Sequence, residues 1–159
     1  MTEDTRVETF RRMMGLLPVK TILQVSYGEK YNLDIIARVK HYEKLMSCSL
    51  TESPKGLSYR NESFDLVLAY NTLSHLAPEN LQLAVDEIAR VANLFVLIID
   101  QWSFSEEKVG DIWLRDYGTV FWHLKAIDWG NLTKEDGFKE EPNWWLFEKV
   151  ILPFKLEFV

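Results

Sequence analysis

The sequence predicts a three-layer α/β fold in which a mostly parallel sheet carries an antiparallel C-terminal hairpin. Strand patterns alternate with helical patterns up to Asp100, as in parallel sheets whose strands are joined by crossover helices. The segment 94–100, LFVLIID, is apolar on both faces, as a central parallel strand must be. Two closing strand patterns, 126–132 and 144–152, predict the hairpin. We expect a mixed sheet of about five to seven strands.

The N-terminal part predicts a helix, a strand and a second helix. Over 3–17, apolar residues recur at steps of three and four until Pro18 ends the helical pattern. The β-branched and apolar run 21–26 predicts a buried strand, and the following YGEK predicts a turn. Helical spacing returns over 33–42 and completes a unit of strand, loop and helix.

The middle of the chain repeats this order. Residues 44–50 predict a short strand, and the polar segment 52–62, with proline and glycine, predicts a long connection. The sequence FDLVLAY at 64–70 predicts another buried strand, and the helix after it has Pro78 in its first turn. Asn93 is the expected C-terminal stop of this helix.

The C-terminal part no longer alternates between strand and helix patterns. Residues 102–111 predict a loop, and 112–124 predict a bulky, partly helical segment before the two closing strands. The 159 residues are enough to bury a sizeable core, and no segment requires a domain boundary. We therefore treat 1–159 as a single domain.

Composition and charge exclude several functional classes. Hydrophobic residues make up 47% and charged residues 26%, the balance of a soluble globular protein. The net charge of −6, with no basic cluster, argues against nucleic-acid binding. The longest apolar run, 94–99, is far shorter than the ~20 residues that span a bilayer, and the charged N-terminus lacks a signal-peptide pattern. We expect a cytoplasmic protein that binds neither nucleic acid nor membrane.

Metal and thiol chemistry have little support in the sequence. Cys48 is the only cysteine, so it cannot form an internal disulfide and is expected to be a buried structural thiol. His41, His75 and His123 are scattered, without the spacing of a metal site. No G-x-G-x-x-G or phosphate-loop pattern is present, which disfavours other nucleotide-binding folds. We expect no metal.

The segment from Tyr59 to Asp100 carries a family resemblance. Its sequence, YRNESFDLVLAYNTLSHLAPENLQLAVDEIARVANLFVLIID, resembles the central part of class I S-adenosylmethionine-dependent methyltransferases. In that family a similar strand leads through a Pro-Glu helix to an EIARV-like phrase and an apolar strand. The resemblance implies a Rossmann-like, shortened methyltransferase fold, S-adenosylmethionine as the cofactor and a small-molecule acceptor.

A narrower resemblance involves the first loop and the tail. RDYGTVFW and NWWLFEK look similar to the end of methylases associated with pseudaminic acid biosynthesis, small class I enzymes found with surface-sugar pathways. The first loop of that group often reads LE.GANIG.NL, and LQVSYGEKYNL retains Leu23, Asn32 and Leu33 at matching positions. This resemblance implies a sugar-type acceptor.

The cofactor candidates follow from the position of ligands in such sheets. Ligands bind beyond the carboxyl ends of the strands, where the first loop meets its neighbours. A tyrosine there can stack on a purine or cap a sulfonium, or it can simply pack at the sheet edge. On this pattern the cofactor-binding candidates are Ser26, Tyr27, Gly28, Asn32, Ser49, Tyr70 and Asn71.

The chain also departs from the family pattern in the cofactor region. Ser26 and Lys30 stand where the family has glycines that let the backbone approach the ligand, and Gln24 replaces the usual acidic residue. Gly28 either restores a turn nearby or is an ordinary turn residue. Only about thirty residues separate Leu33 from Phe64, where the family usually has a helix, a strand, a second helix and a second strand. We therefore expect one helix, and one strand or none, to be missing from the region that usually builds the adenine pocket.

His75, in SHLAPEN, is the candidate catalytic residue. A histidine in this position can accept a proton from an attacking hydroxyl or amine, or it can be a loop residue satisfied by the backbone. The late aromatic residues can line an acceptor pocket, contact a partner or pack in the core. The substrate or partner candidates are Tyr117, Trp122, Trp144 and Trp145.

The doublet Trp144-Trp145 suggests an interface. In a strand, successive side chains point to opposite faces, so we expect one of these rings to lie outside the core. An exposed tryptophan favours a partner surface or a homodimer. Two functions therefore remain open: a methyltransferase-like domain with a degenerate cofactor site that acts by binding, which the departures favour, and an active methyltransferase.

Overall fold

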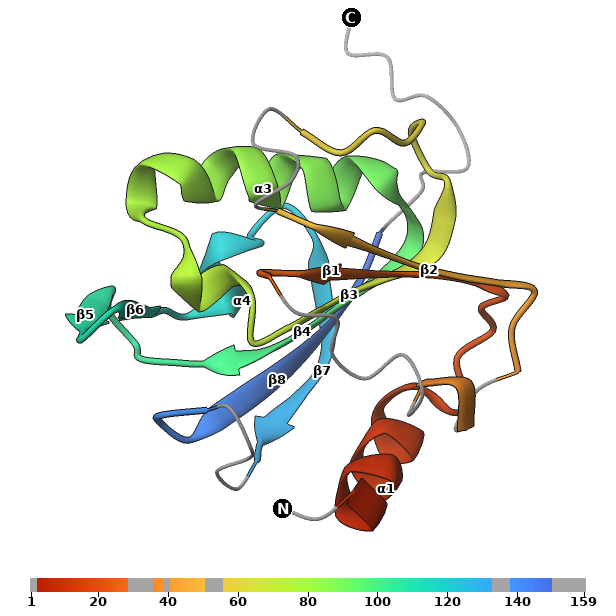
Figure 1. Ribbon diagram of the computed structural model, residues 1–159, viewed down its shortest axis with the longest axis horizontal. Helices are drawn as coiled ribbons and strands as arrows, with labels where there is room; N and C mark the ends of the chain where they lie inside the picture. Colours follow the sequence, from red (N-terminus) through yellow and green to blue (C-terminus); the bar gives the residue numbers. More distant parts are fainter. Residues whose placement is uncertain (1–2, 29–35, 39–40, 51–55, 133–137, 150–159) are drawn as a thin grey trace, which may run out of the picture.

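A six-stranded mixed sheet forms the centre of the computed structural model, which describes residues 3–28, 36–38, 41–50, 56–132 and 138–149. The strand order is β2-β1-β3-β4-β8-β7 (Figure 1). The first four strands are parallel, and β8 and β7 join them antiparallel, as predicted. The bounds are β1 Thr21–Ser26, β2 Lys44–Ser49, β3 Phe64–Tyr70, β4 Ala92–Gln101, β7 Lys125–Asn131 and β8 Pro142–Glu148.

Helices cover both faces of this sheet (Figure 1). Helix α1 (Glu3–Met14) packs on one face, and helices α3 (Pro78–Val91) and α4 (Tyr117–Val120) pack on the other. Alternate residues of the central strands enter the two cores, with Val67 in the cluster under α3 and Leu66 in the cluster under α1. This double cover explains the uninterrupted apolar runs of β3 and β4.

Most predicted elements are confirmed, with differences after β4 and at one helix end. The predicted loop contains β5 (Glu107–Val109), which forms a hairpin with β6 (Ile112–Leu114) around Gly110 at φ +62°. The predicted helical segment that follows retains only one turn, α4. Helix α3 ends before Asn93, because Ala92 is already extended and begins β4.

The predicted helix 33–42 is only partly described by the structure. Residues 36–38 of the predicted helix 33–42 are helical, and residues 33–35 and 39–40 lie outside the described residues. Residues 41–42 are not helical, so the predicted end of this helix is wrong. Within the described chain, no helix combines the length and the apolar character that a membrane crossing needs.

The prediction that one ring of the tryptophan doublet lies outside the core is wrong. Trp144 and Trp145 do point to opposite faces of β8, but their exposed fractions are only 7% and 5%. Strand β8 lies between β4 and β7, so both of its faces are covered by core side chains. The exposed rings are instead Trp122 at 79% and Trp129 at 63%.

Candidate functional site

The carboxyl ends of β1 and β2 are joined by polar contacts. The amide of Leu50 donates to the Ser26 carbonyl at 2.9 Å, and the Gly28 amide donates to Ser49 Oγ at 3.3 Å. The Ser26 hydroxyl donates to the Cys48 carbonyl at 3.3 Å. Three predicted cofactor residues, Ser26, Gly28 and Ser49, therefore lie together, and these contacts connect the two strand ends.

The loop after β1 keeps one glycine for a conformational reason. Gly28 has φ +85°, and a Cβ placed there would meet no atom within 4 Å, so the backbone angle rather than space favours glycine. Gln24 is fully buried, and neither polar atom of its amide has a hydrogen-bond partner in the described part of the chain. Asn32 and Lys30 lie outside the described residues.

The loop after β3 is built on the buried carboxylate of Asp100. Its Oδ2 accepts from the amides of Thr72 and Ser74 at 3.1 Å each, and its Oδ1 accepts from the Gln101 amide at 2.8 Å. Burial raises the pKa of Asp100, and these donors act against the rise. The Gln101 side chain donates to Asn71 Oδ1 at 3.3 Å, so Asn71 belongs to this framework.

A buried arginine completes the framework. The Arg115 guanidinium donates to the carbonyl of Leu73 at 2.8 Å and to that of Leu76 at 2.6 Å, and it pairs with Glu106 at 2.7 Å. These carbonyls flank the short helix η1 (Leu73–His75), which carries His75. The buried side chains of Asp100 and Arg115 therefore hold the backbone of the loop that carries His75.

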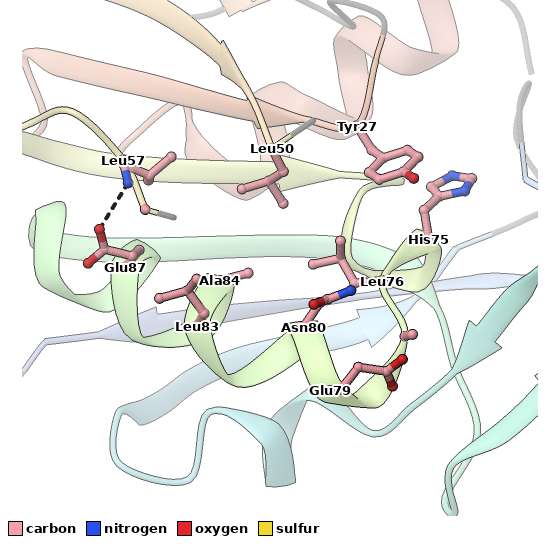
Figure 2. Close-up of a pocket in the computed structure, with 12 residues that line it drawn as sticks. Tyr27, Leu50, Leu57, His75, Leu76, Glu79, Asn80, Leu83, Ala84 and Glu87 are labelled. Atoms are coloured by element: carbon pink, nitrogen blue, oxygen red, sulfur yellow. Dashed lines mark hydrogen bonds between the residues drawn. The ribbon is translucent and has the colours of Figure 1, made fainter. Parts of the chain in front are cut away.

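Two aromatic rings connect the loops after β1 and β3. The rings of Tyr27 and His75 stack with centroids 5.0 Å apart and planes 9° from parallel, and Figure 2 shows them side by side. Tyr27 keeps 39% of its surface exposed. The structure therefore brings together the catalytic candidate and one cofactor candidate.

A pocket of about 450 Å³ lies between these loops and α3 (Figure 2). This volume is within the range of roughly 300–1,000 Å³ typical of small-molecule sites. Apolar side chains dominate the lining, with polar groups at its ends. The lining residues are Tyr27, Leu50, Gly56, Leu57, His75, Leu76, Ala77, Glu79, Asn80, Leu83, Ala84 and Glu87.

An ion pair on α3 fixes the far wall of the pocket. The Leu57 amide donates to Glu87 Oε1 at 2.9 Å, and Arg90 pairs with Glu87 at 2.6 Å (Figure 2 shows the Leu57 contact). Arg90 also donates to the carbonyls of Leu57 and Tyr59. The hydrogen bond from Arg90 lowers the pKa of Glu87. This contact holds the polar connection after residue 55 against the helix.

The sequence patterns did not identify most of this pocket. The connection after residue 55 contributes Leu57, and the surface of α3 contributes Asn80, Leu83 and Glu87. Side chains in such segments usually face water. The sequence carried one signal, because Leu83 is an apolar residue on the polar side of the helical pattern. In the structure, 45% of the Leu83 surface is exposed.

The other predicted site residues lie away from the pocket. Tyr70 is buried in the core, with its ring between those of Phe10 and Phe138 at 5.9 and 5.0 Å. Tyr117 is buried against Trp145 at 5.3 Å, and burial raises the pKa of its phenol. Trp122, Trp144 and Trp145 are also absent from the pocket lining.

No cluster of three potential metal ligands occurs in the described ranges.

Comparisons with known proteins agree with this architecture. Residues 20–93, from the start of β1 to the start of β4, match the family described as a methyltransferase domain. No curated protein gives a significant match. The fold is similar to that of a chain from the complex between the Haloferax volcanii Trm112 methyltransferase activator and a methyltransferase. The TM-score is 0.68 at 11% sequence identity, and the alignment covers 96% of this chain and 93% of that chain.

Two further solved structures have the same fold. One is a methyltransferase dependent on S-adenosylmethionine from Methanosarcina mazei, with TM-score 0.61, 10% identity, and coverage of 89% of this chain and 98% of that chain. The other is 1,6-didemethyltoxoflavin-N1-methyltransferase from Burkholderia thailandensis with bound 1,6-didemethyltoxoflavin and S-adenosylhomocysteine; its TM-score is 0.64, with 10% identity and 94% and 78% coverage. Residues 20–93 thus match a methyltransferase domain, and the chain has the fold of class I S-adenosylmethionine-dependent methyltransferases.

Proposed function

We propose that this protein is a methyltransferase-fold binding domain whose S-adenosylmethionine site is degenerate and whose methyl transfer is reduced or lost. The contact of Ser26 with β2 carries this proposal. The Ser26 side chain is fully buried where the family resemblance implies glycine, and its hydroxyl donates to the Cys48 carbonyl. A Cβ at such a position takes the space that a close backbone approach to the ligand requires.

S-Adenosylmethionine supplies an electrophilic methyl group when it is bound. The residues of this chain fit its adenosine end better than its methionine end, because the pocket lies beside Tyr27 and α3 while the ends of β1 and β2 are joined to each other. Methyl transfer depends mainly on alignment of the two reactants, so a displaced methionine end lowers the rate.

An active methyltransferase with a small-molecule or sugar-type acceptor is the second candidate. The pocket of about 450 Å³ and the position of His75 at its rim favour it. In that case His75 would accept the proton that the acceptor loses. The bound ligands of the Burkholderia thailandensis neighbour support this alternative by analogy of fold alone.

A protein partner is part of the binding role that we propose. The Haloferax volcanii neighbour comes from a complex with a methyltransferase activator. In this chain, Trp122 and Trp129 are exposed, and large aromatic side chains are common anchors of protein interfaces. A partner or a second copy of the chain would use these two rings rather than Trp144 and Trp145.

Calorimetric titration with S-adenosylmethionine and S-adenosylhomocysteine tests the proposal. We expect dissociation constants of about 100 µM or weaker for the wild type. Ser26→Gly should tighten binding of S-adenosylmethionine about tenfold, because it removes the Cβ, whereas Ser26→Ala, which keeps the Cβ, should not. Low-micromolar binding by the wild type, with no gain in Ser26→Gly, would show that the site is intact.

A further inference from the structure

We infer that two copies of this chain associate through the outer edge of β7, in an antiparallel strand pair that continues the sheet across a twofold axis. The inference rests on the proposed function, because it names a second copy as the partner of the binding role. Strand β7 is the last strand in the sheet order, and among the described strands it pairs only with β8. Its outer edge therefore presents backbone donors and acceptors to a further strand.

This edge is exposed and carries two large apolar side chains. Every residue of Lys125–Asn131 is exposed except Gly130, which is half-buried. The exposed fractions of Ile127 and Trp129 are 38% and 63%. Isoleucine and tryptophan favour strands, and apolar side chains on an unpaired edge favour the addition of another strand.

The pairing of β7 with β8 decides which side chains share a face. The pairs are Lys125–Glu148, Ala126–Phe147, Asp128–Leu146 and Trp129–Trp145, with a register shift between Ala126 and Asp128. Residues two apart on a strand share a face, so Lys125 and Asp128 lie on one face of β7. By the same rule, Ala126 and Trp129 lie together on the other face.

These side chains make β7 complementary to itself. In an antiparallel pair with its axis between residues 127 and 128, Trp129 of each copy lies opposite the small Ala126 of the other. On the opposite face, Lys125 of each copy lies diagonally beside Asp128 of the other. Cross-strand contacts of both kinds stabilise a sheet, and the twofold axis forms each of them twice. This pattern is what favours a second copy over an unrelated strand.

The two charged groups are available for this contact. The Asp128 carboxylate accepts from the Trp129 amide at 3.0 Å through Oδ1, which holds the side chain beside the strand. Neither Asp128 Oδ2 nor the Lys125 ammonium has a partner within the ranges that the structure describes. A cation from the second copy would therefore complete a charge pair without breaking another one.

The burial of Trp129 supplies the apolar part of the association. Trp129 lies beside Trp145, which packs on Tyr117 with ring centroids 5.3 Å apart. Covering the exposed part of the Trp129 ring would extend this aromatic cluster into the dimer. The paired segment has only seven residues, so the interface is small, and we expect a dissociation constant of about 10–100 µM.

Sedimentation velocity on the full chain, from about 5 µM to 1 mM, tests the inference. The mass should rise from one chain to two as the concentration increases. Trp129→Ala should weaken the association at least about tenfold, because it removes the ring that each copy buries. Phe104→Ala is the matched control, since Phe104 is an aromatic residue with 85% of its surface exposed and lies outside β7, and it should leave the association unchanged.

A charge exchange tests the antiparallel arrangement itself. Lys125→Asp and Asp128→Lys should each weaken self-association at least about tenfold, because each places like charges side by side across the axis. A mixture of the two variants should restore association to within about threefold of the wild type, because every cross-strand contact then joins a lysine and an aspartate. Sedimentation with one variant fluorescently labelled measures the mixed dimer, and circular dichroism checks that each variant is folded.

The outcomes separate this inference from the proposed function. A single-chain mass at all concentrations, an association that Trp129→Ala does not weaken, or a mixture of charge variants that does not associate would each overturn the β7 dimer. These results would leave the degenerate cofactor site standing, because calorimetry with S-adenosylmethionine tests that site independently. Low-micromolar binding of S-adenosylmethionine by a chain that still dimerises through β7 would instead overturn the degenerate site alone.

Discussion

The two loops that flank the pocket are stabilised in different ways. The loop after β3 rests on buried charged groups, with Asp100 accepting from three backbone amides and Arg115 donating to two carbonyls. The loop after β1 is held by contacts with β2 at 2.9–3.3 Å and by an exposed ring stack. The comparison indicates that the loop carrying His75 is the fixed reference, and that Tyr27 on the other loop is positioned against it.

Removing the arginine tests the fixed loop most severely. Arg115→Met should lower the free energy of unfolding by roughly 2–4 kcal/mol, because the carbonyls of Leu73 and Leu76 lose their donor in a buried site. Urea denaturation measures the change. Lys139→Met, which removes an exposed ion pair with Asp111, is the control and should have little effect. Equal stability of both variants would mean that the loop does not depend on Arg115.

The carboxylate of the same framework has a smaller effect and a pH signature. Asp100→Asn should cost about 1–3 kcal/mol at neutral pH, because an amide oxygen cannot replace both acceptor oxygens. The pKa of Asp100 is raised in the folded state, so its contribution to stability decreases as pH rises from the ordinary carboxyl pKa through the raised one.

Denaturation of Asp100→Asn at a series of pH values checks this sign. The variant should lose that part of the pH dependence, and its stability curve should be flatter than that of the wild type over the same interval. A steeper curve in the variant would contradict the assignment.

The loop after β1 should tolerate change better. Gly28→Ala should cost about 1 kcal/mol, since φ +85° is unfavourable for a residue with a Cβ although the space is free. Gly110→Ala, at φ +62° in the β5–β6 hairpin and also without a close neighbour, is the matched control. Thermal unfolding should show similar losses. If the Gly28 loop positions Tyr27, only Gly28→Ala should also weaken the binding of S-adenosylhomocysteine.

The sheet could be predicted from the sequence because its signals are local. The apolar runs of β1, β3 and β4 and the helical stripe of α3 depend on each segment's own residues, and their order predicts the parallel arrangement. The tryptophan doublet shows the limit of this reasoning. Alternation correctly placed Trp144 and Trp145 on opposite faces, but burial of both depends on β8 being an interior strand.

The site was harder to predict because it depends on tertiary contacts. Ser26, Tyr27, Gly28 and Ser49 were named from their positions at strand ends, which the topology brings to one edge, and His75 was named from the family resemblance. Of these five residues, Tyr27 and His75 line the pocket. The wall formed by α3 was missed, because a polar helix surface looks the same in sequence whether water or a loop faces it. The contact of Arg90 and Glu87 with Leu57 creates that wall, and it joins segments distant in sequence.

The tryptophans are confined to the C-terminal part of the chain, away from the pocket lining. All six tryptophans follow Gln101, and none lines the pocket. Indole emission therefore comes from side chains outside the pocket lining, and the buried Trp144 and Trp145 contribute the part that reports the packing of β8. A ligand that raises the midpoint of an emission-monitored unfolding curve would thus demonstrate that the pocket and the C-terminal hairpin unfold as one cooperative unit.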